Sequence, residues 1–158
     1  MMRDEQEPAA ASPETSVSAP GYSLDASAGH MLRRAHQRYQ SMFQECAAGL
    51  GLTGPQFAAL LRLSEMGRVT QNHLGRLAAM DSATVQGVVR RLVDRGLVQA
   101  EADRQDRRTR ILTITEAGAE LLSAAQKAGR RANDSVLAPL SAAERRQLLA
   151  MLRRVAEG

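Results

Sequence analysis

The chain has 158 residues, enough for one domain with a buried core. Its 44% hydrophobic content with 3% aromatic residues indicates packing by Leu, Ala and Val, which favours helices. One cysteine, Cys46, excludes an internal disulfide, and the sequence shows neither a membrane-length apolar run nor a signal-peptide core. We therefore expect a cytoplasmic protein.

The positive charge is concentrated outside the N-terminal region. Residues 1–25 carry one Arg against five carboxylates, a net −4, so the total of +4 leaves +8 for the remainder. Of the 21 basic residues all but Lys127 are Arg, a preference that suits phosphate and base-edge recognition. A GC-rich gene would produce the same bias, so this observation carries little weight by itself.

Residues 1–23 are rich in Ala, Ser, Pro and Glu, and they predict a disordered tail. A first helix is expected from about residue 24 to residue 48, ended by Gly49 and Gly51. Its apolar stripe consists of Leu32, Ala35, Tyr39, Met42, Phe43 and Cys46.

Three helices are expected between residues 53 and 96. Thr53-Gly-Pro-Gln56 has the form of a capping box with proline in the first turn, and the helix that it opens runs to Gly67. Thr70 starts a short third helix through residue 78. Asp81 and Ser82 are suited to cap a fourth, which Gly96 ends in a left-handed conformation. The buried stripe of this fourth helix is Val85, Val88, Val89 and Leu92.

Residues 97–101 and 109–115 alternate as two strands around a basic loop at 103–108. Thr115 can cap a fifth helix that stops before Pro139, and Ser141-Ala-Ala-Glu144 is a second capping box that starts a last helix. These terminal helices are more apolar than one small winged domain needs. We therefore expect them, with the first helix, to pack against a second copy of the chain.

The fold class is predicted as mainly α with a small β-hairpin wing, because the third and fourth helices form a helix-turn-helix and the hairpin follows at once. A single domain is expected over residues 24–158. Residues 24–50 and 116–158 would supply the dimerisation helices, and residues 53–115 the winged helix-turn-helix.

The chain from Leu24 to Val155 resembles the MarR family of bacterial transcription regulators. Five motifs carry the resemblance in order: Asp81-Ser-Ala-Thr-Val85, Val89-Arg-Arg-Leu92, Asp94-Arg-Gly-Leu-Val98, Asp103-Arg-Gln-Asp-Arg-Arg108 and Leu112-Thr-Ile-Thr-Glu-Ala-Gly118. The resemblance implies a homodimer that binds a pseudo-palindromic operator, usually to repress, and releases it when a small molecule or oxidant binds.

A narrower resemblance is to the regulators of nicotinic acid breakdown, which respond to a hydroxylated nicotinate such as 6-hydroxynicotinate. It rests on Leu32-Arg-Arg-Ala-His-Gln-Arg-Tyr39, Gln71-Asn-His-Leu-Gly-Arg-Leu77 and Met80-Asp-Ser-Ala-Thr84.

The candidate DNA contacts lie on the face of the fourth helix opposite its buried stripe, in the wing and at the start of the third helix. Arg90 and Arg91 on an isolated helix would be an ordinary solvated face, but their setting favours DNA. Of the two arginines at 107 and 108, one would enter the minor groove and the other would anchor at phosphate or fold back onto Asp106. Arg104 and Arg110 suit backbone contacts or plain surface. The candidates are Thr70, Gln71, Asn72, Ser82, Ala83, Thr84, Gln86, Arg90, Arg91, Arg104, Arg107 and Arg108.

The candidate effector site follows from the family resemblance, which places effectors between the dimerising helices and the winged domain. An aromatic carboxylate needs apolar walls, here Tyr39 and Phe43, a cationic anchor, here Arg33, and a polar partner, His36 or His73. A lone histidine such as His36 is also a common packing residue, and Cys46 is interpreted as packing.

Zinc and enzymatic functions are disfavoured. His30 and His36 are six residues apart, about 240° around a helix, and no Cys or His pair has the spacing of a helical zinc site. No phosphate-binding glycine loop, nucleophile motif or acid–base pair is present, so we expect no cofactor and no catalysis. The rival class is a ligand-binding or protein-interaction module with only weak, non-specific DNA binding.

Overall fold

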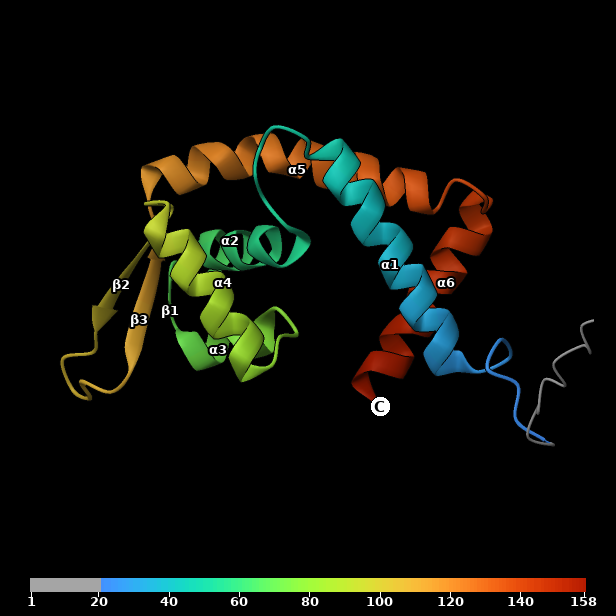
Figure 1. The fold of residues 1–158 in the computed structure, drawn as a ribbon, viewed down its shortest axis with the longest axis horizontal. Coiled ribbons are helices and arrows are strands. Elements are labelled where there is room, and N and C mark those ends of the chain that lie inside the picture. Colours follow the sequence, from blue (N-terminus) through green and yellow to red (C-terminus); the bar gives the residue numbers. More distant parts are fainter. Residues whose placement is uncertain (1–20) are drawn as a thin grey trace, which may run out of the picture.

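The computed structural model describes residues 21–158, a helical arch with a small sheet at one end (Figure 1). Along the chain it comprises α1 (Ala28–Cys46), α2 (Gly54–Met66), β1 (Arg68–Thr70), α3 (Gln71–Leu77), α4 (Ser82–Asp94), β2 (Val98–Ala102), β3 (Arg110–Ile114), α5 (Glu116–Val136) and α6 (Ala142–Glu157). The fold class predicted from the sequence is confirmed. Most of the predicted tail, residues 1–20, lies outside the described residues.

Side-chain caps fix where the helices begin. Both predicted capping boxes, at Thr53 and Ser141, are present, and Asp81 and Thr115 cap α4 and α5 as expected. The first helix was predicted too long: α1 begins at Ala28 rather than residue 24, because the Ser27 hydroxyl accepts a hydrogen bond from the backbone N–H of His30 and caps the helix there.

The sheet has one more strand than the sequence predicted. Its order is β1–β3–β2 with antiparallel pairing, and Val69 of β1 lies opposite Leu112 of β3. A three-residue strand is too short to show alternation, which is why β1 was missed. The two wing strands are present, and each of their four ends lies one residue from its predicted position.

Two apolar clusters hold the arch together. The larger joins α2, α3, α4, the sheet and the first half of α5, with Leu60, Leu63, Leu74, Leu92 and Leu112 fully buried. The smaller packs Phe43 and Ala47 at the end of α1 against Ala128 and Ala132 of α5. The ring centroid of Phe43 lies 5.2 Å from that of Phe57, and Phe57 packs against both clusters. The winged helix-turn-helix part and the pair of helices α1 and α5 are therefore one continuous packed body.

Helix α6 contributes no buried residue to this chain. In Figure 1 it descends from the far end of α5, on the same side of the arch as α1. Its exposed apolar side chains, together with two on α1, are Leu149, Met151, Leu152, Val155, Met31 and Leu32. None of the helices within residues 21–158 is long and apolar enough to cross a membrane.

Candidate functional site

Helix α4 presents one apolar and one polar face. Its apolar face is buried in the larger cluster, whereas Ser82, Ala83, Thr84, Gln86 and Arg90 are exposed. The Asp81 carboxylate accepts a 2.7 Å hydrogen bond from the backbone N–H of Thr84. That hydrogen bond and, to a smaller extent, one from the Thr84 hydroxyl lower the pKa of Asp81. A capped helix with an exposed face of small and hydrogen-bonding groups has the shape and chemistry to enter a DNA major groove.

The loop between β2 and β3 is shaped by two carboxylates. Asp106 accepts a 3.0 Å hydrogen bond from the backbone N–H of Arg108 and a 2.8 Å bond from the Thr109 hydroxyl, and these bonds lower the pKa of Asp106. Asp103 accepts from the backbone N–H of Gln105 at 2.9 Å. Asp106 is thus engaged by the loop itself, and the Arg108 side chain does not fold back onto it.

The arginines of this loop remain exposed. Arg104, Arg107 and Arg108 lie on the surface, and none of the ion pairs found among residues 21–158 includes them. Guanidinium groups held on an ordered hairpin tip suit phosphate and a narrow minor groove. The predicted wing residues are therefore placed where such contact is possible.

A polar groove joins the wing to the start of α3. Its lining combines Thr70, Gln71 and Asn72 with Arg76, Arg108, Thr109 and Arg110. Thr70 also caps α3, accepting a 3.2 Å hydrogen bond from the backbone N–H of His73. The structure thus brings the predicted Thr70, Gln71 and Asn72 together with Arg108 of the wing, whereas Arg104 and Arg107 do not line this groove. Contact of any of these residues with DNA stays a prediction.

An open cavity of about 760 Å³ lies where α1, α2, the α3–α4 turn and the start of α4 meet. Its volume falls in the range of small-molecule sites. The walls are mainly apolar, and the lining residues are His36, Tyr39, Gln40, Gly54, Pro55, Phe57, Ala58, Leu61, Arg62, Glu65, Leu77, Ala78, Ala79, Met80, Asp81 and Thr84.

Polar side chains from α1 and α2 give this cavity its chemistry. The Arg62 guanidinium pairs with Glu65 at 2.8 Å and donates to the Leu77 carbonyl at 3.2 Å. His36 lies 2.9 Å from Gln40 through their side-chain nitrogens, so its ring is oriented along α1. Burial raises the pKa of the Tyr39 phenol, which keeps the hydroxyl in its neutral, hydrogen-bonding form.

Only two of the five predicted effector residues line the cavity, namely His36 and Tyr39. Arg33 is exposed on α1 nearly one turn before His36, and His73 lies in the first turn of α3, whereas the cavity reaches only its last residue. Phe43 is fully buried behind the cavity against Phe57, which supplies the wall instead.

Sequence reasoning missed the cation of this cavity. This cation is Arg62 of α2. Its sequence signal was that it interrupts an otherwise apolar stretch from Phe57 to Leu63. In an isolated helix such an arginine is an ordinary exposed residue. Only the packing of α1 and the α3–α4 turn around it shows that it borders a cavity.

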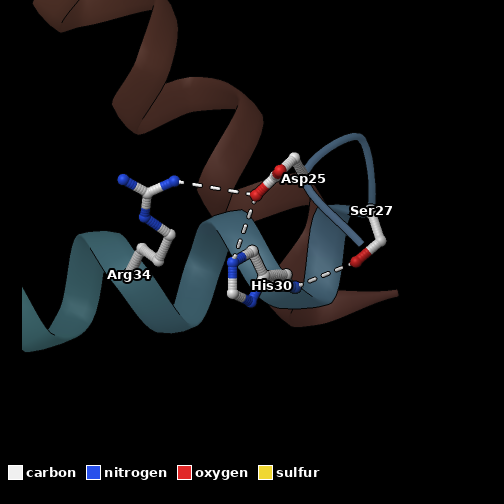
Figure 2. Close-up of polar contacts among 4 residues, drawn as sticks. All are labelled: Asp25, Ser27, His30 and Arg34. Carbon is white, nitrogen blue, oxygen red and sulfur yellow. Dashed lines mark hydrogen bonds and ion pairs between the residues drawn. The ribbon is translucent and has the colours of Figure 1, made fainter. Parts of the chain in front are cut away.

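A separate polar cluster closes the start of α1 (Figure 2). The Asp25 carboxylate lies 3.7 Å from the His30 imidazole and 4.0 Å from the Arg34 guanidinium, and Ser27 caps the helix beside them. His30 thus has a carboxylate neighbour. Among residues 21–158 no group of three or more His, Cys, Asp or Glu side chains is arranged to hold a metal ion.

Comparisons with known proteins agree with this architecture. Residues 50–109 match the sequence profile of the MarR family. The HTH-type transcriptional repressor NicR of Pseudomonas putida is 39% identical over 134 residues, which cover 85% of each chain. A probable transcriptional regulator from Pseudomonas aeruginosa is 46% identical, with a TM-score of 0.78 over 84% of this chain and 99% of that one.

A third relative has a known small-molecule signal. It is BpsR of Bordetella bronchiseptica, whose DNA binding is regulated by 6-hydroxynicotinic acid. It is 32% identical, with a TM-score of 0.81 over 87% of this chain and 99% of that one.

Proposed function

This chain belongs to the MarR family of transcription regulators, and from that premise we propose that it is a homodimeric repressor released from its operator by a small aromatic acid. The observation that carries the proposal is a cavity whose wall is shared by α1 and by the first turn of α4, the DNA-reading helix. An occupant of that cavity touches the element that reads DNA.

The DNA side of the proposal rests on three exposed polar surfaces, on α4, on the wing and at the start of α3. The exposed face of α4 would lie in the major groove, the wing arginines would reach the adjoining minor groove, and the start of α3 would face phosphate. Gln86, at the middle of the exposed face, has the amide that pairs bidentately with adenine.

The homodimer is supported by the uncovered apolar face of α6 and the start of α1. Val155 is 69% exposed and Met31 is 49% exposed, although both belong to helices with a clear apolar stripe. Monomeric proteins rarely leave a patch of this kind uncovered. A second copy packed there would set two α4 helices at a fixed separation, which a pseudo-palindromic operator requires.

The effector that fits the cavity has a flat ring, a carboxylate and one further polar substituent. Phe57, Leu61 and Tyr39 offer apolar contact to the ring, Arg62 attracts the carboxylate, and His36 or the Tyr39 hydroxyl pairs with a ring hydroxyl or oxo group. 6-Hydroxynicotinate has all three features, and BpsR responds to this same acid. Nicotinate lacks the ring hydroxyl or oxo group.

Release follows if the occupied cavity favours a different position of α4. The turn from Leu77 to Asp81 lines the cavity, and Ala79 within it adopts a left-handed backbone (φ 52°) that only a well-determined turn maintains. A ligand preference of about 1.4 kcal/mol for the non-binding arrangement lowers operator affinity tenfold.

The test of the DNA function is footprinting on the DNA upstream of the protein's own gene, combined with a salt titration. The expected result is two protected half-sites roughly one helical turn apart, about 34 Å, with affinity that falls steeply as salt rises. Gln86→Ala is expected to relax base preference within each half-site. Weak binding without sequence preference would instead support the interaction-module alternative.

A further inference from the structure

The connector between α1 and α2, residues 47–53, is held by a side chain from α4. The Arg95 guanidinium donates to the backbone carbonyl of Gly51 at 2.5 Å and to that of Leu50 at 3.3 Å. Arg95 is the C-cap residue of α4 and lies 44 residues from Gly51 in the sequence. The C-terminal end of α4 is thereby hydrogen-bonded to the connector, in addition to the local backbone hydrogen bonds that Arg95 and Gly96 donate to the last turn of the helix.

The chemistry of this contact calls for arginine and glycine. A guanidinium offers several N–H donors in a rigid planar fork and reaches two successive carbonyls at once, whereas a lysine ammonium is a single compact charge. Gly51 has φ +61°, in the left-handed region that favours glycine, and a Cβ there would lie 3.5 Å from the Arg95 guanidinium. The guanidinium therefore lies directly against the Gly51 backbone.

A second arginine, on α5, holds the backbone just before this connector. Arg131 of α5 donates to the carbonyl of Cys46, the last residue of α1, at 2.7 Å. The C-terminal end of α1 is thus hydrogen-bonded to Arg131 of α5, and the connector that follows it is hydrogen-bonded to Arg95 at the end of α4. In Figure 1 the connector passes from the junction of α1 and α5 down to α2.

The two ends of α4 are linked to α1 in different ways, across the cavity at one end and through the connector at the other. At the N-terminal end, His36 and Tyr39 of α1 line the cavity together with Asp81 and Thr84. At the C-terminal end of α4, Arg95 donates hydrogen bonds to the connector that follows α1. Both ends of α4 thus have a structural route to α1.

We infer that Arg95 is a positioning residue that couples occupancy of the cavity to operator affinity through the α1–α2 connector. The inference rests on the proposed function and adds its route of communication. Arg95 itself touches neither the cavity nor the exposed face of α4 that reads bases.

The test compares Arg95→Ala and Arg95→Lys with the parent and with Arg130→Ala, an exposed arginine of α5 used as the matched control. The measured quantity is the coupling ratio, the operator Kd with saturating 6-hydroxynicotinate divided by the Kd without it. Parent and control are expected to give a ratio of about ten or more. Arg95→Ala is expected to fall below threefold and Arg95→Lys to recover part of the ratio.

Calorimetry on the DNA-free protein separates coupling from binding. The affinity of Arg95→Ala for 6-hydroxynicotinate is expected to stay within about twofold of the parent, because Arg95 does not line the cavity. A parent-like coupling ratio in Arg95→Ala, with or without a lower melting temperature, would show that the contact only stabilises the fold and would overturn the inference.

Amide hydrogen exchange tests, without any ligand, whether the Arg95 contact holds the connector in place. In Arg95→Ala, amides of residues 47–53 and of the last turn of α4 are expected to exchange at least threefold faster, while those of α5 keep the parent's rates. Unchanged exchange in the connector overturns the inference whatever the effector. If the parent fails to bind 6-hydroxynicotinate, the proposed effector is refuted. The exchange rates still decide whether Arg95 holds the connector in place.

Discussion

Replacing Arg62 with Gln tests the effector site at its one cationic side chain. A hydrogen bond to a charged group contributes about 1.5–3 kcal/mol when it is well shielded. The Arg62 side chain is 47% exposed, so solvent screening reduces this to roughly 1 kcal/mol, or about fivefold in Kd. We therefore expect Arg62→Gln to bind 6-hydroxynicotinate about fivefold more weakly in calorimetry.

Two further variants make this test discriminating. Arg33→Gln removes the anchor that the sequence suggested, but this side chain lies outside the cavity, and the variant is expected to bind as the parent does. Glu65→Gln removes the carboxylate that competes for Arg62 and is expected to bind the acid more tightly. The reasoning is refuted if Arg33→Gln weakens binding while Arg62→Gln leaves it unchanged.

Further predictions concern DNA contact, packing, pH and assembly. Arg107→Ala should weaken operator binding by about 1 kcal/mol or more and reduce preference for A·T-rich minor grooves, as measured by anisotropy on matched duplexes. Gly118→Ala should destabilise the fold by about 1–3 kcal/mol in urea unfolding, because the new Cβ would lie 2.2 Å from the Leu97 carbonyl, whereas Gly29→Ala, with open space around it, should not destabilise. Hydrogen bonds led by the Thr84 backbone N–H lower the pKa of Asp81, so its carboxylate stabilises the fold above its usual pKa of 3.8, and this contribution is lost as the pH falls through the lowered value. Melting temperatures of Asp81→Asn should therefore fall less than those of the parent between about pH 5 and about pH 3. Sedimentation at micromolar concentration should show a dimer, and a stable folded monomer would contradict the assembly.

Local signals in the sequence were sufficient for most of the fold. The capping residues Thr53, Asp81, Thr115 and Ser141 act on backbone N–H groups two or three residues away, so their role is visible in the sequence itself. The buried stripe of α4 follows from helical periodicity for the same reason. β1 was missed because three residues are too few to show alternation and because its pairing with β3 joins segments far apart in the chain.

The effector cavity shows where local reasoning ends. His36 and Tyr39 were found because they share a face of α1, but the remaining walls come from α2 and from the α3–α4 turn. Arg33 was chosen as the anchor by closeness in sequence, whereas Arg62 reaches the cavity through the packing of another helix. The Arg95 contact with the connector has no sequence signal at all, because its acceptors are backbone carbonyls.

The central claim is that this regulator leaves its operator when a hydroxylated aromatic acid enters the cavity beside α4. The most direct measurement is fluorescence anisotropy of the preformed complex with the upstream duplex, titrated with 6-hydroxynicotinate and in parallel with nicotinate. We expect at least tenfold weaker operator binding with 6-hydroxynicotinate and a smaller effect of nicotinate. An operator affinity that neither acid changes up to millimolar concentration would contradict it.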